Sequence, residues 1–302
     1  MSSLRLGLLS DLHRTTDSRC RDRFHNEYDF AGHLARVERA LAWFAERKVD
    51  ALILCGDLTH TAGEQAMAAV LGECALQLPA PTIVVSGNHD ASMGEDLLSA
   101  AVAHLGSDRV VLGAPRGEMI GAIRVAGVHV APSFTDSRSR LQAMPAVRDW
   151  GAEPVVLVSH LPILSRAGAV AARGMPYPGD LIDREPAAAL LSARRAATVV
   201  VSGHIHVRDA SAEGPVLQLL QAAMIESPFE AATLDVLAEP DGRVLVTRQS
   251  HRTSDKQFDY EPTLAGSSGS WRYIEGRWKA AEACADASQD GTVVADQVAS
   301  AR

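Results

Sequence analysis

Seven side chains that can bind metal ions each follow a short apolar run, at the point where that run ends. They are Asp11 and His13 after LRLGLLS, Asp57 after ALILCG, Asn88 after TIVVSG, His160 after VVLVS, and His204 and His206 after TVVVSG. None is a thiolate, so the set disfavours a structural zinc site of the cysteine type. Carboxylate, imidazole and amide ligands together suit manganese, iron or zinc.

Seven ligands are too many for one ion, but they fit two divalent ions if one carboxylate bridges them. Two ions about 3.5–4 Å apart can clamp the attacking and leaving oxygens of an in-line displacement at phosphorus. They also lower the pKa of a bound water, which supplies hydroxide near neutral pH. The pattern therefore favours hydrolysis of a phosphate ester.

The apolar runs are typical of strands, and amphipathic segments between them are typical of helices. Residues 82–85 are all β-branched, which fits a strand buried on both faces. Apolar residues three or four positions apart predict a helix over 31–48, and a second helix is expected over 64–78. Two right-handed β–α–β crossovers imply a parallel sheet, and ligands bind at the carboxyl edge of such sheets.

Beyond residue 109 the links between apolar runs shorten, which predicts a mixed or second sheet. Antiparallel strands are expected over 216–225, 232–238 and 244–249, and a helix over 184–196. A linker-like segment at 266–270 precedes a helix predicted over 271–287, whose tryptophans would pack the tail onto the body or make a dimer contact. We therefore expect a catalytic domain over 1–262 and a linker and tail over 263–302, partly helical or frayed.

Five motifs along the chain resemble those of the calcineurin-like metallophosphoesterase family. They are DLH at 11–13, GD at 56–57, GNHD at 87–90, the lone His160 and GHIH at 203–206, and they occur in the family's order. The resemblance covers roughly residues 4–250 and implies an α/β fold, a four-layer α/β/β/α sandwich of two mixed β-sheets flanked by helices. The chain looks most like the bacterial branch that includes cyclic-nucleotide phosphodiesterases.

The resemblance also implies which residues hold each metal and which act on the substrate. The first metal would be held by Asp11, His13, Asp57 and His206, and the second by Asp57, Asn88, His160 and His204, with Asp57 as the bridge. Hydroxide activated by the metals would attack phosphorus. His89 would protonate or stabilise the leaving oxygen, and Asp90 would orient the His89 ring.

Two further residues are candidates for substrate contact. Arg14 follows the His13 ligand directly and can clamp a phosphate oxygen bidentately, or pair with Asp17 or Asp22. His60 lies three residues after Asp57, in a loop that must border the metals, so it either contacts substrate or shapes that loop. In the branch named above an acidic residue often stands near this position. The polar segment 14–29 is expected to be an exposed loop or cap near the first ligands.

Composition indicates a soluble cytoplasmic protein. The net charge of −8 gives no global basic field for nucleic acid, although it leaves open a local basic groove. The four cysteines have no CxxC spacing, which is typical of a reducing compartment. No usable signal peptide is apparent, and no apolar run approaches the roughly 18–20 residues of a membrane span.

The leading hypothesis is a dinuclear-metal phosphoesterase that acts on a phosphomonoester or a small phosphodiester, with nucleotides among the candidate substrates. The alternative is a DNA or RNA nuclease of the same family, which the acidic balance and the lack of a basic extension disfavour. The third is a non-catalytic scaffold, which is disfavoured because every ligand and His89 are present. The oligomeric state is open, with a dimer as one option.

Overall fold

Each apolar run that precedes a candidate ligand forms a strand. This is seen in a computed structural model, which describes residues 1–17, 19–91, 96–131, 139–177, 181–256, 258 and 260–281. The five strands are β1 (Ser2–Leu9), β2 (Ala51–Leu54), β3 (Thr82–Val84), β7 (Val155–Ser159) and β8 (Thr198–Ser202). The first three lie in one sheet and the other two in a second sheet, as predicted from the change of pattern after residue 109.

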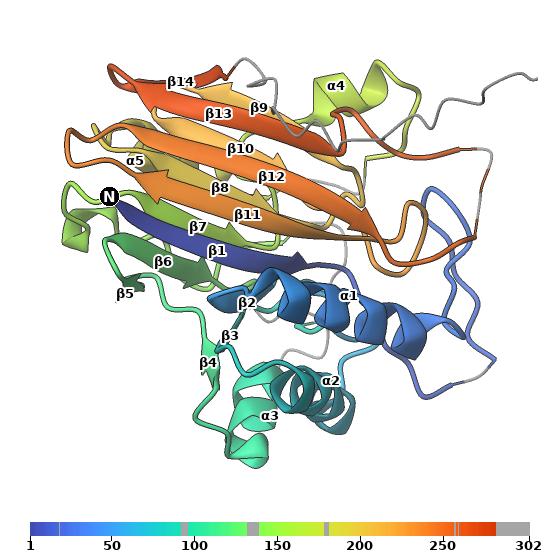
Figure 1. Cartoon of the computed structure of the whole chain (residues 1–302). Coiled ribbons are helices and arrows are strands. Elements are labelled where there is room, and N and C mark those ends of the chain that lie inside the picture. Colours follow the sequence, from blue (N-terminus) through green and yellow to red (C-terminus); the bar gives the residue numbers. More distant parts are fainter. Residues whose placement is uncertain are drawn as a thin grey trace, which may run out of the picture.

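The first sheet is mixed and has the order β14-β13-β12-β11-β1-β2-β3-β4 (Figure 1). Strands β1 to β4 (Val110–Leu112) are parallel, as the β–α–β pattern predicts. On the other side of β1, the antiparallel strands β11 (Glu230–Ala238) and β12 (Val244–Arg252) continue the sheet. The connection after each parallel strand therefore starts at the same edge.

The second sheet has the order β5-β6-β7-β8-β10-β9 and is also mixed. It adds β5 (Glu118–Ile120), β6 (Ile123–Val128), β9 (Asp209–Glu213) and β10 (Val216–Leu220) to the two ligand-bearing strands. Strand β10 is parallel to β8 and antiparallel to β9. The strand predicted over 216–225 is thus shorter than expected and is not purely antiparallel, because the chain leaves the sheet after Leu220.

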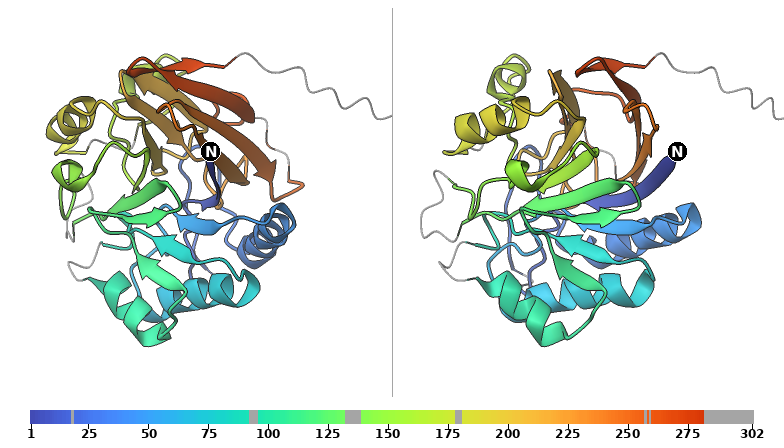
Figure 2. Two further views of the ribbon diagram at one scale, coloured as in Figure 1. Left: turned by 60° about the vertical axis from the view of Figure 1, so that its left-hand side comes forward. Right: turned by 90° about the vertical axis from the view of Figure 1, so that its left-hand side faces the viewer.

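The two sheets face each other, and helices cover their outer faces (Figure 2). Helices α1 (His33–Arg47), α2 (Glu64–Gln77) and α3 (Leu97–Leu105) pack on the first sheet, and α5 (Arg184–Ser192) packs on the second. The remaining helical turns are α4 (Ala167–Ala171) and a 3-10 turn at Val147–Asp149. The four-layer α/β/β/α sandwich is confirmed.

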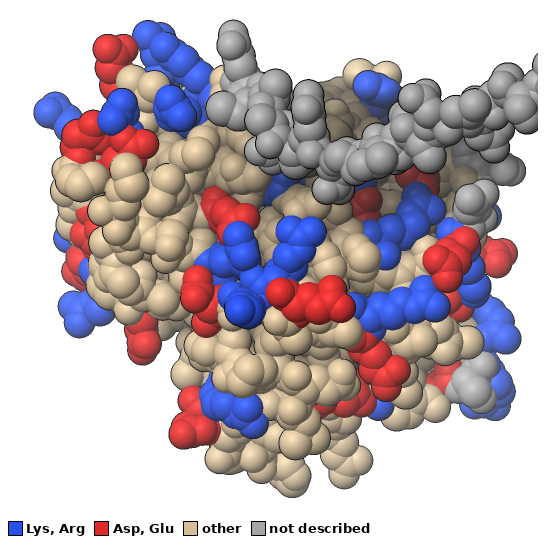
Figure 3. All heavy atoms as spheres, viewed as in Figure 1, with Lys and Arg blue, Asp and Glu red and all other residues tan. Residues whose placement is uncertain are grey.

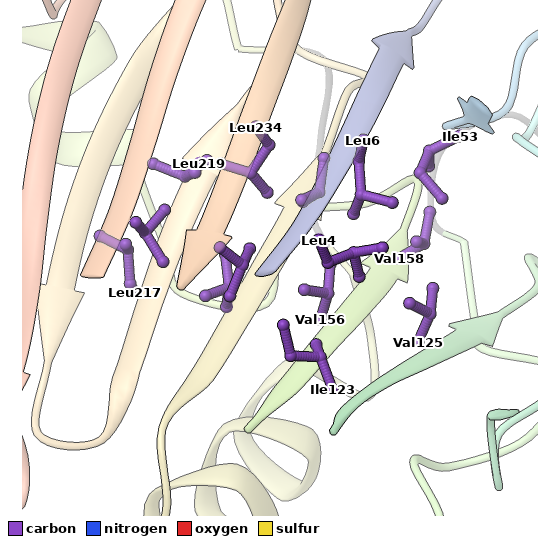
Figure 4. Close-up of a cluster of buried hydrophobic side chains, with 14 of the residues drawn as sticks. Leu4, Leu6, Ile53, Ile123, Val125, Val156, Val158, Leu217, Leu219 and Leu234 are labelled. Atoms are coloured by element: carbon purple, nitrogen blue, oxygen red, sulfur yellow. The ribbon is translucent and has the colours of Figure 1, made fainter. Parts of the chain in front are cut away.

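Alternation along the strands produces this layering. In β2, Ile53 points into the core between the sheets, whereas Leu52 and Leu54 pack against the helices. Figure 4 shows the core between the sheets, where leucine, isoleucine and valine side chains from both sheets meet. The ligand-bearing strands are largely buried on both faces toward their carboxyl ends, and the metal-capable side chains stand in the loops that follow those ends.

The helix predicted over 271–287 is wrong for the part that the structure describes. Residues Ser268–Ile274 form β13, and Arg277–Ala280 form β14, a hairpin added to the edge of the first sheet. Its turn, Glu275-Gly276, has positive φ at both residues, as a tight hairpin turn requires. Trp278 is buried in the core between the sheets, which confirms that it packs this segment onto the body. Residues 282–302 lie outside the described part, and the domain boundary after 262 stays a prediction.

The surface carries charges of both signs close together. On the face drawn in Figure 3, lysine and arginine side chains alternate with aspartate and glutamate, without a continuous basic band among the residues described there. Within the described ranges, no helix is long and apolar enough to cross a membrane.

Candidate metal centre

The ends of the five strands bring the seven predicted ligands together in two groups. In the first group, Asp11, His13 and His206 offer ligand atoms that lie within 4.8 Å of one another. In the second group, Asp57, His160 and His204 do the same. Each group combines residues that follow strands of both sheets.

Asp57 lies between the two groups. Its Oδ2 atom is 3.2 Å from Nε2 of His160 and 3.6 Å from Nε2 of His13. Asn88 completes the set, because its Oδ1 is 3.1 Å from the same nitrogen of His160. Asp57 therefore lies between the two groups, as expected for the bridging ligand that the family resemblance implies.

The backbone at these positions is unusual. Five of the seven residues have left-handed backbone, with φ between 48° and 68°: Asp11, His13, Asp57, His204 and His206. For residues other than glycine this conformation costs about 1–3 kcal/mol each, and it persists only where the surrounding structure enforces it. Such strain is concentrated at functional sites, and here it turns each strand end sharply toward the centre.

Two glycines leave room for the carboxylates. A Cβ atom at Gly87 would lie 2.1 Å from Oδ1 of Asp57, and one at Gly203 would lie 2.4 Å from Oδ2 of Asp11. Any side chain at either position would displace a candidate ligand. The motif glycines are thus explained by the space that these carboxylates occupy.

These residues fit a pair of divalent ions. The donors are carboxylate oxygens, an amide oxygen and imidazole nitrogens, which suit manganese, iron or zinc. Nε2 of His13 is buried and has no hydrogen-bond partner among the described residues. An unpaired buried nitrogen is costly unless something binds it, and a metal ion would do so.

A cavity of ≈ 440 Å³ opens onto the two groups. Asp22, Phe24 and Tyr28 of the segment 14–29 form one side of it. The ring of Tyr28 lies 5.2 Å from that of His13, and the ring of Phe24 lies 5.5 Å from that of His206. The described residues 22–28 therefore form a cap over the first ligands, which is one of the two forms expected for the segment 14–29.

His89 of the GNHD motif and His60 of the loop after Asp57 also line this cavity, as their positions in the sequence predict. Nδ1 of His89 lies 2.7 Å from the main-chain carbonyl of His60, so Nδ1–H donates to that oxygen. The main-chain N–H of His89 donates to Oδ1 of Asp57, at 2.9 Å. The His89 ring is thus held beside the bridging carboxylate.

The expected contact between Asp90 and the His89 ring is replaced by another arrangement. Both Asp90 carboxylate oxygens accept main-chain N–H groups, from Gly87, Leu58 and Thr59, at 3.0–3.1 Å. Burial and the nearby Asp57 raise the pKa of Asp90 to about 6. Asp90 ties the loop after β2 to the loop after β3, and the His60 carbonyl takes the role of orienting His89.

Arg14 does not take the position expected of a phosphate clamp. Its guanidinium forms an ion pair with Glu73 on helix α2, and Arg14 is not among the described residues that line the cavity. The partner is therefore neither Asp17 nor Asp22. The sequence could not show this, because Glu73 is brought close only by the packing of α2 on the first sheet.

The sequence model described as Calcineurin-like phosphoesterase matches residues 4–208, which is more than half of the chain. The chain belongs to the calcineurin-like phosphoesterase family. The family resemblance drawn from the five motifs is thereby confirmed. No curated protein matches the sequence significantly.

The chain was also compared with solved structures. The protein TT1561 of Thermus thermophilus is 13% identical, with a TM-score of 0.51 over 84% of this chain and 100% of its own. A dimetal phosphatase from Danio rerio is also 13% identical, with a TM-score of 0.47 over 83% of this chain and 99% of its own. At this identity the first similarity supports the fold alone.

In this calcineurin-like phosphoesterase one further residue, Glu226, belongs to the site. It is fully buried, and its Oε1 lies 2.5 Å from Nδ1 of His206. Its other oxygen accepts the N–H of Asn26 in the cap. Glu226 stands directly after the apolar stretch 216–225, so the rule that located the other ligands also applies to it, but it lies outside the family motifs.

Removing the Glu226 carboxylate should weaken metal binding. Partners of this kind orient a ligating histidine, and their loss typically costs about 10–100-fold in metal affinity. We expect this loss in Glu226→Ala, measured by calorimetric titration of metal-free protein with Mn²⁺. Glu226→Gln keeps an oxygen that can accept from Nδ1–H and should lose less. Equal affinity of Glu226→Ala and wild type would contradict the assignment.

Metal binding should also release protons. Burial opposes charge on His206, but Asp11 and Glu226 outweigh it and raise the pKa of His206 to about 10. In the same way Asp57 outweighs burial and raises the pKa of His160 to about 9. We therefore expect both rings to carry a proton at pH 7 in the metal-free protein and to lose it on binding a metal.

The affinity for Mn²⁺ should therefore rise between pH 6 and pH 9, by about tenfold per pH unit for each proton released. Calorimetry in two buffers of different ionisation enthalpy counts these protons. A binding enthalpy that is the same in both buffers would show that no proton is released.

A larger cavity of ≈ 1020 Å³ lies away from this centre. It is lined by residues near the starts of β1, β7 and β8, among them Ser2, Pro154 and Ala197. None of the candidate metal ligands contributes to it, so its size does not make it the site of this chemistry.

Proposed function

We propose that this protein is a dinuclear-metal phosphoesterase that hydrolyses a phosphomonoester or a small phosphodiester, nucleotides included. One observation carries the proposal. The Asp57 carboxylate lies between two groups of metal-capable side chains, in a cavity that also contains His89.

The ligand set proposed for each ion is the one implied by the family motifs. One ion would be held by Asp11, His13, Asp57 and His206, and the other by Asp57, Asn88, His160 and His204. We propose Mn²⁺, iron or Zn²⁺ as the metals. Such a pair, when bound, supplies hydroxide near neutral pH and neutralises charge that develops on the phosphoryl group.

His89 is the proposed acid for the leaving group. Its Nδ1–H is committed to the His60 carbonyl, so a second proton on this ring must sit at Nε2. The leaving oxygen of a substrate in the cavity would accept that proton as the ester bond breaks. Asp57 supports this role, because it accepts the His89 N–H and so fixes the residue.

The cavity favours a small substrate. Its volume of ≈ 440 Å³ lies within the range of small-molecule sites, and Phe24 and Tyr28 offer apolar surface. Its described lining contains Asp22 and neither lysine nor arginine, so it lacks the basic groups that hold a nucleic acid backbone. This supports a small ester over the nuclease alternative.

A substrate panel with Mn²⁺-loaded protein tests the proposal. It compares p-nitrophenyl phosphate, its bis ester, cyclic nucleotides, nucleoside monophosphates and single-stranded DNA. We expect metal-dependent hydrolysis of at least one aryl ester and one small nucleotide, and no degradation of DNA. Failure to hydrolyse any aryl ester would favour the non-catalytic scaffold, and efficient DNA degradation would favour the nuclease.

A further inference from the structure

The His60 ring lies between the cap and a candidate metal ligand. Its Nε2 is 3.5 Å from Oδ2 of Asp22, and its Nδ1 is 3.5 Å from Nδ1 of His13. The side chain of His60 is 12% exposed, and the rings of Phe30 and His89 also pack against it. The side chains of Asp22, His60 and His13 form a chain of polar contacts that runs from the cap into the metal centre.

The chemistry of these groups favours one placement of the protons. A carboxylate can only accept, so Oδ2 of Asp22, 3.5 Å away, favours the tautomer of neutral His60 that carries its proton on Nε2. The other Asp22 oxygen already accepts the N–H of Arg23, at 2.7 Å. In neutral His60 the Nδ1 atom is then bare and can only accept, so the proton between the two rings belongs to Nδ1 of His13.

That tautomer of His13 leaves its Nε2 free. This is the buried nitrogen that has no hydrogen-bond partner among the described residues, because Oδ2 of Asp57 lies 3.6 Å from it, beyond hydrogen-bond distance. A metal ion binds the bare nitrogen of a neutral imidazole, and the partner of the opposite nitrogen determines which one is bare.

We propose that His60 is a positioning residue that fixes His13 in the tautomer able to bind metal, with Asp22 fixing His60 in turn. The inference rests on the proposed function, because it concerns the same centre. It assigns the His60 side chain a role other than substrate contact. The His60 carbonyl orients His89 as well, so this residue would set one metal ligand and the proposed acid.

Nitrogen NMR of metal-free protein labelled with ¹⁵N-histidine tests the tautomer directly. Long-range proton–nitrogen spectra distinguish protonated from bare ring nitrogens. We expect His13 of the wild type to carry its proton on Nδ1, and His60→Ala to show a mixture of tautomers. His60→Asn places an amide oxygen where Nδ1 lies and should restore the wild-type pattern. A wild-type His13 protonated on Nε2 would overturn the proposal.

Calorimetric titration with Mn²⁺ gives a second readout. We expect His60→Ala to lose about 10–100-fold in affinity, as other supports of metal-bound histidines do. Asp22→Ala should lose less, and His60→Asn should bind nearly as the wild type does. The control is His104→Ala, whose ring lies on the surface of α3 and is paired with Glu64. Thermal unfolding of each variant checks that it is folded.

The outcomes separate this inference from the proposed function. Wild-type protein that binds no divalent ion would end both. Wild-type protein that binds two ions, with His60→Ala binding them equally well, would end the inference alone. The inference would also be overturned if the wild type bound three ions and His60→Ala bound two. In that case His13, His60 and His89 would themselves hold a metal.

Discussion

Asp57→Asn is expected to reduce kcat/KM for an aryl phosphate by at least about 10³-fold. Bound metals stabilise the charge of the transition state by several kcal/mol, and each 1.36 kcal/mol lost slows the reaction tenfold. Asp57 is the carboxylate that lies between the two groups, and a neutral amide cannot replace its charge. Metal analysis of the purified variant should show fewer ions per chain than in the wild type.

A matched control is Asp235→Asn. Asp235 lies on β11, where it is 41% exposed and pairs with Arg5, far from the strand ends that form the centre. We expect this variant to keep its metal content and its rate. If Asp57→Asn kept wild-type activity and a full complement of metal, Asp57 would not be a ligand of the centre and the proposed mechanism would be wrong.

His89→Ala is expected to lose about 10²–10⁴-fold in kcat on substrates with poor leaving groups, such as alkyl phosphates or nucleotides, since this is the usual contribution of a general acid. The loss on p-nitrophenyl phosphate should be much smaller, because that leaving group barely needs a proton. The comparison of the two substrates within one variant cancels any general damage to the site.

The metal content of His89→Ala should equal that of the wild type, because the proposed ligand set does not include this residue. Equal losses on both classes of substrate would argue that His89 acts on something other than the leaving oxygen. A loss of metal would instead place its ring among the ligands, with His13 and His60.

The strand ends explain why so much of the centre can be predicted from sequence. Where a strand is buried on both faces, a metal-binding side chain has room only beyond the end of the strand. The strands that precede Asp11, Asp57 and His160 are buried along the part that leads to their carboxyl ends. Parallel pairing then brings neighbouring strand ends to one edge. The four-layer fold and the meeting of all seven residues therefore follow from pattern and family resemblance together.

Contacts that depend on the direction of a side chain could not be predicted from the sequence pattern. The acidic Asp90 lies next to His89 in sequence, but its carboxylate turns back to bind main-chain N–H groups of the loop after β2. The segment beyond residue 270 has tryptophans at a helical spacing. Its pairing with β12 and the turn at Glu275-Gly276 nevertheless make it a hairpin. In both cases a tertiary contact outweighs the local pattern.

Because the candidate ligands follow strands of both sheets, bound ions would join the two halves of the sandwich. Asp11 follows β1 and His206 follows β8, which belong to different sheets and lie far apart along the chain. An ion held by both acts as a removable cross-link, and it stabilises only the folded chain. The concentration of free metal around the protein would then govern its melting temperature and its resistance to proteases, as well as its rate.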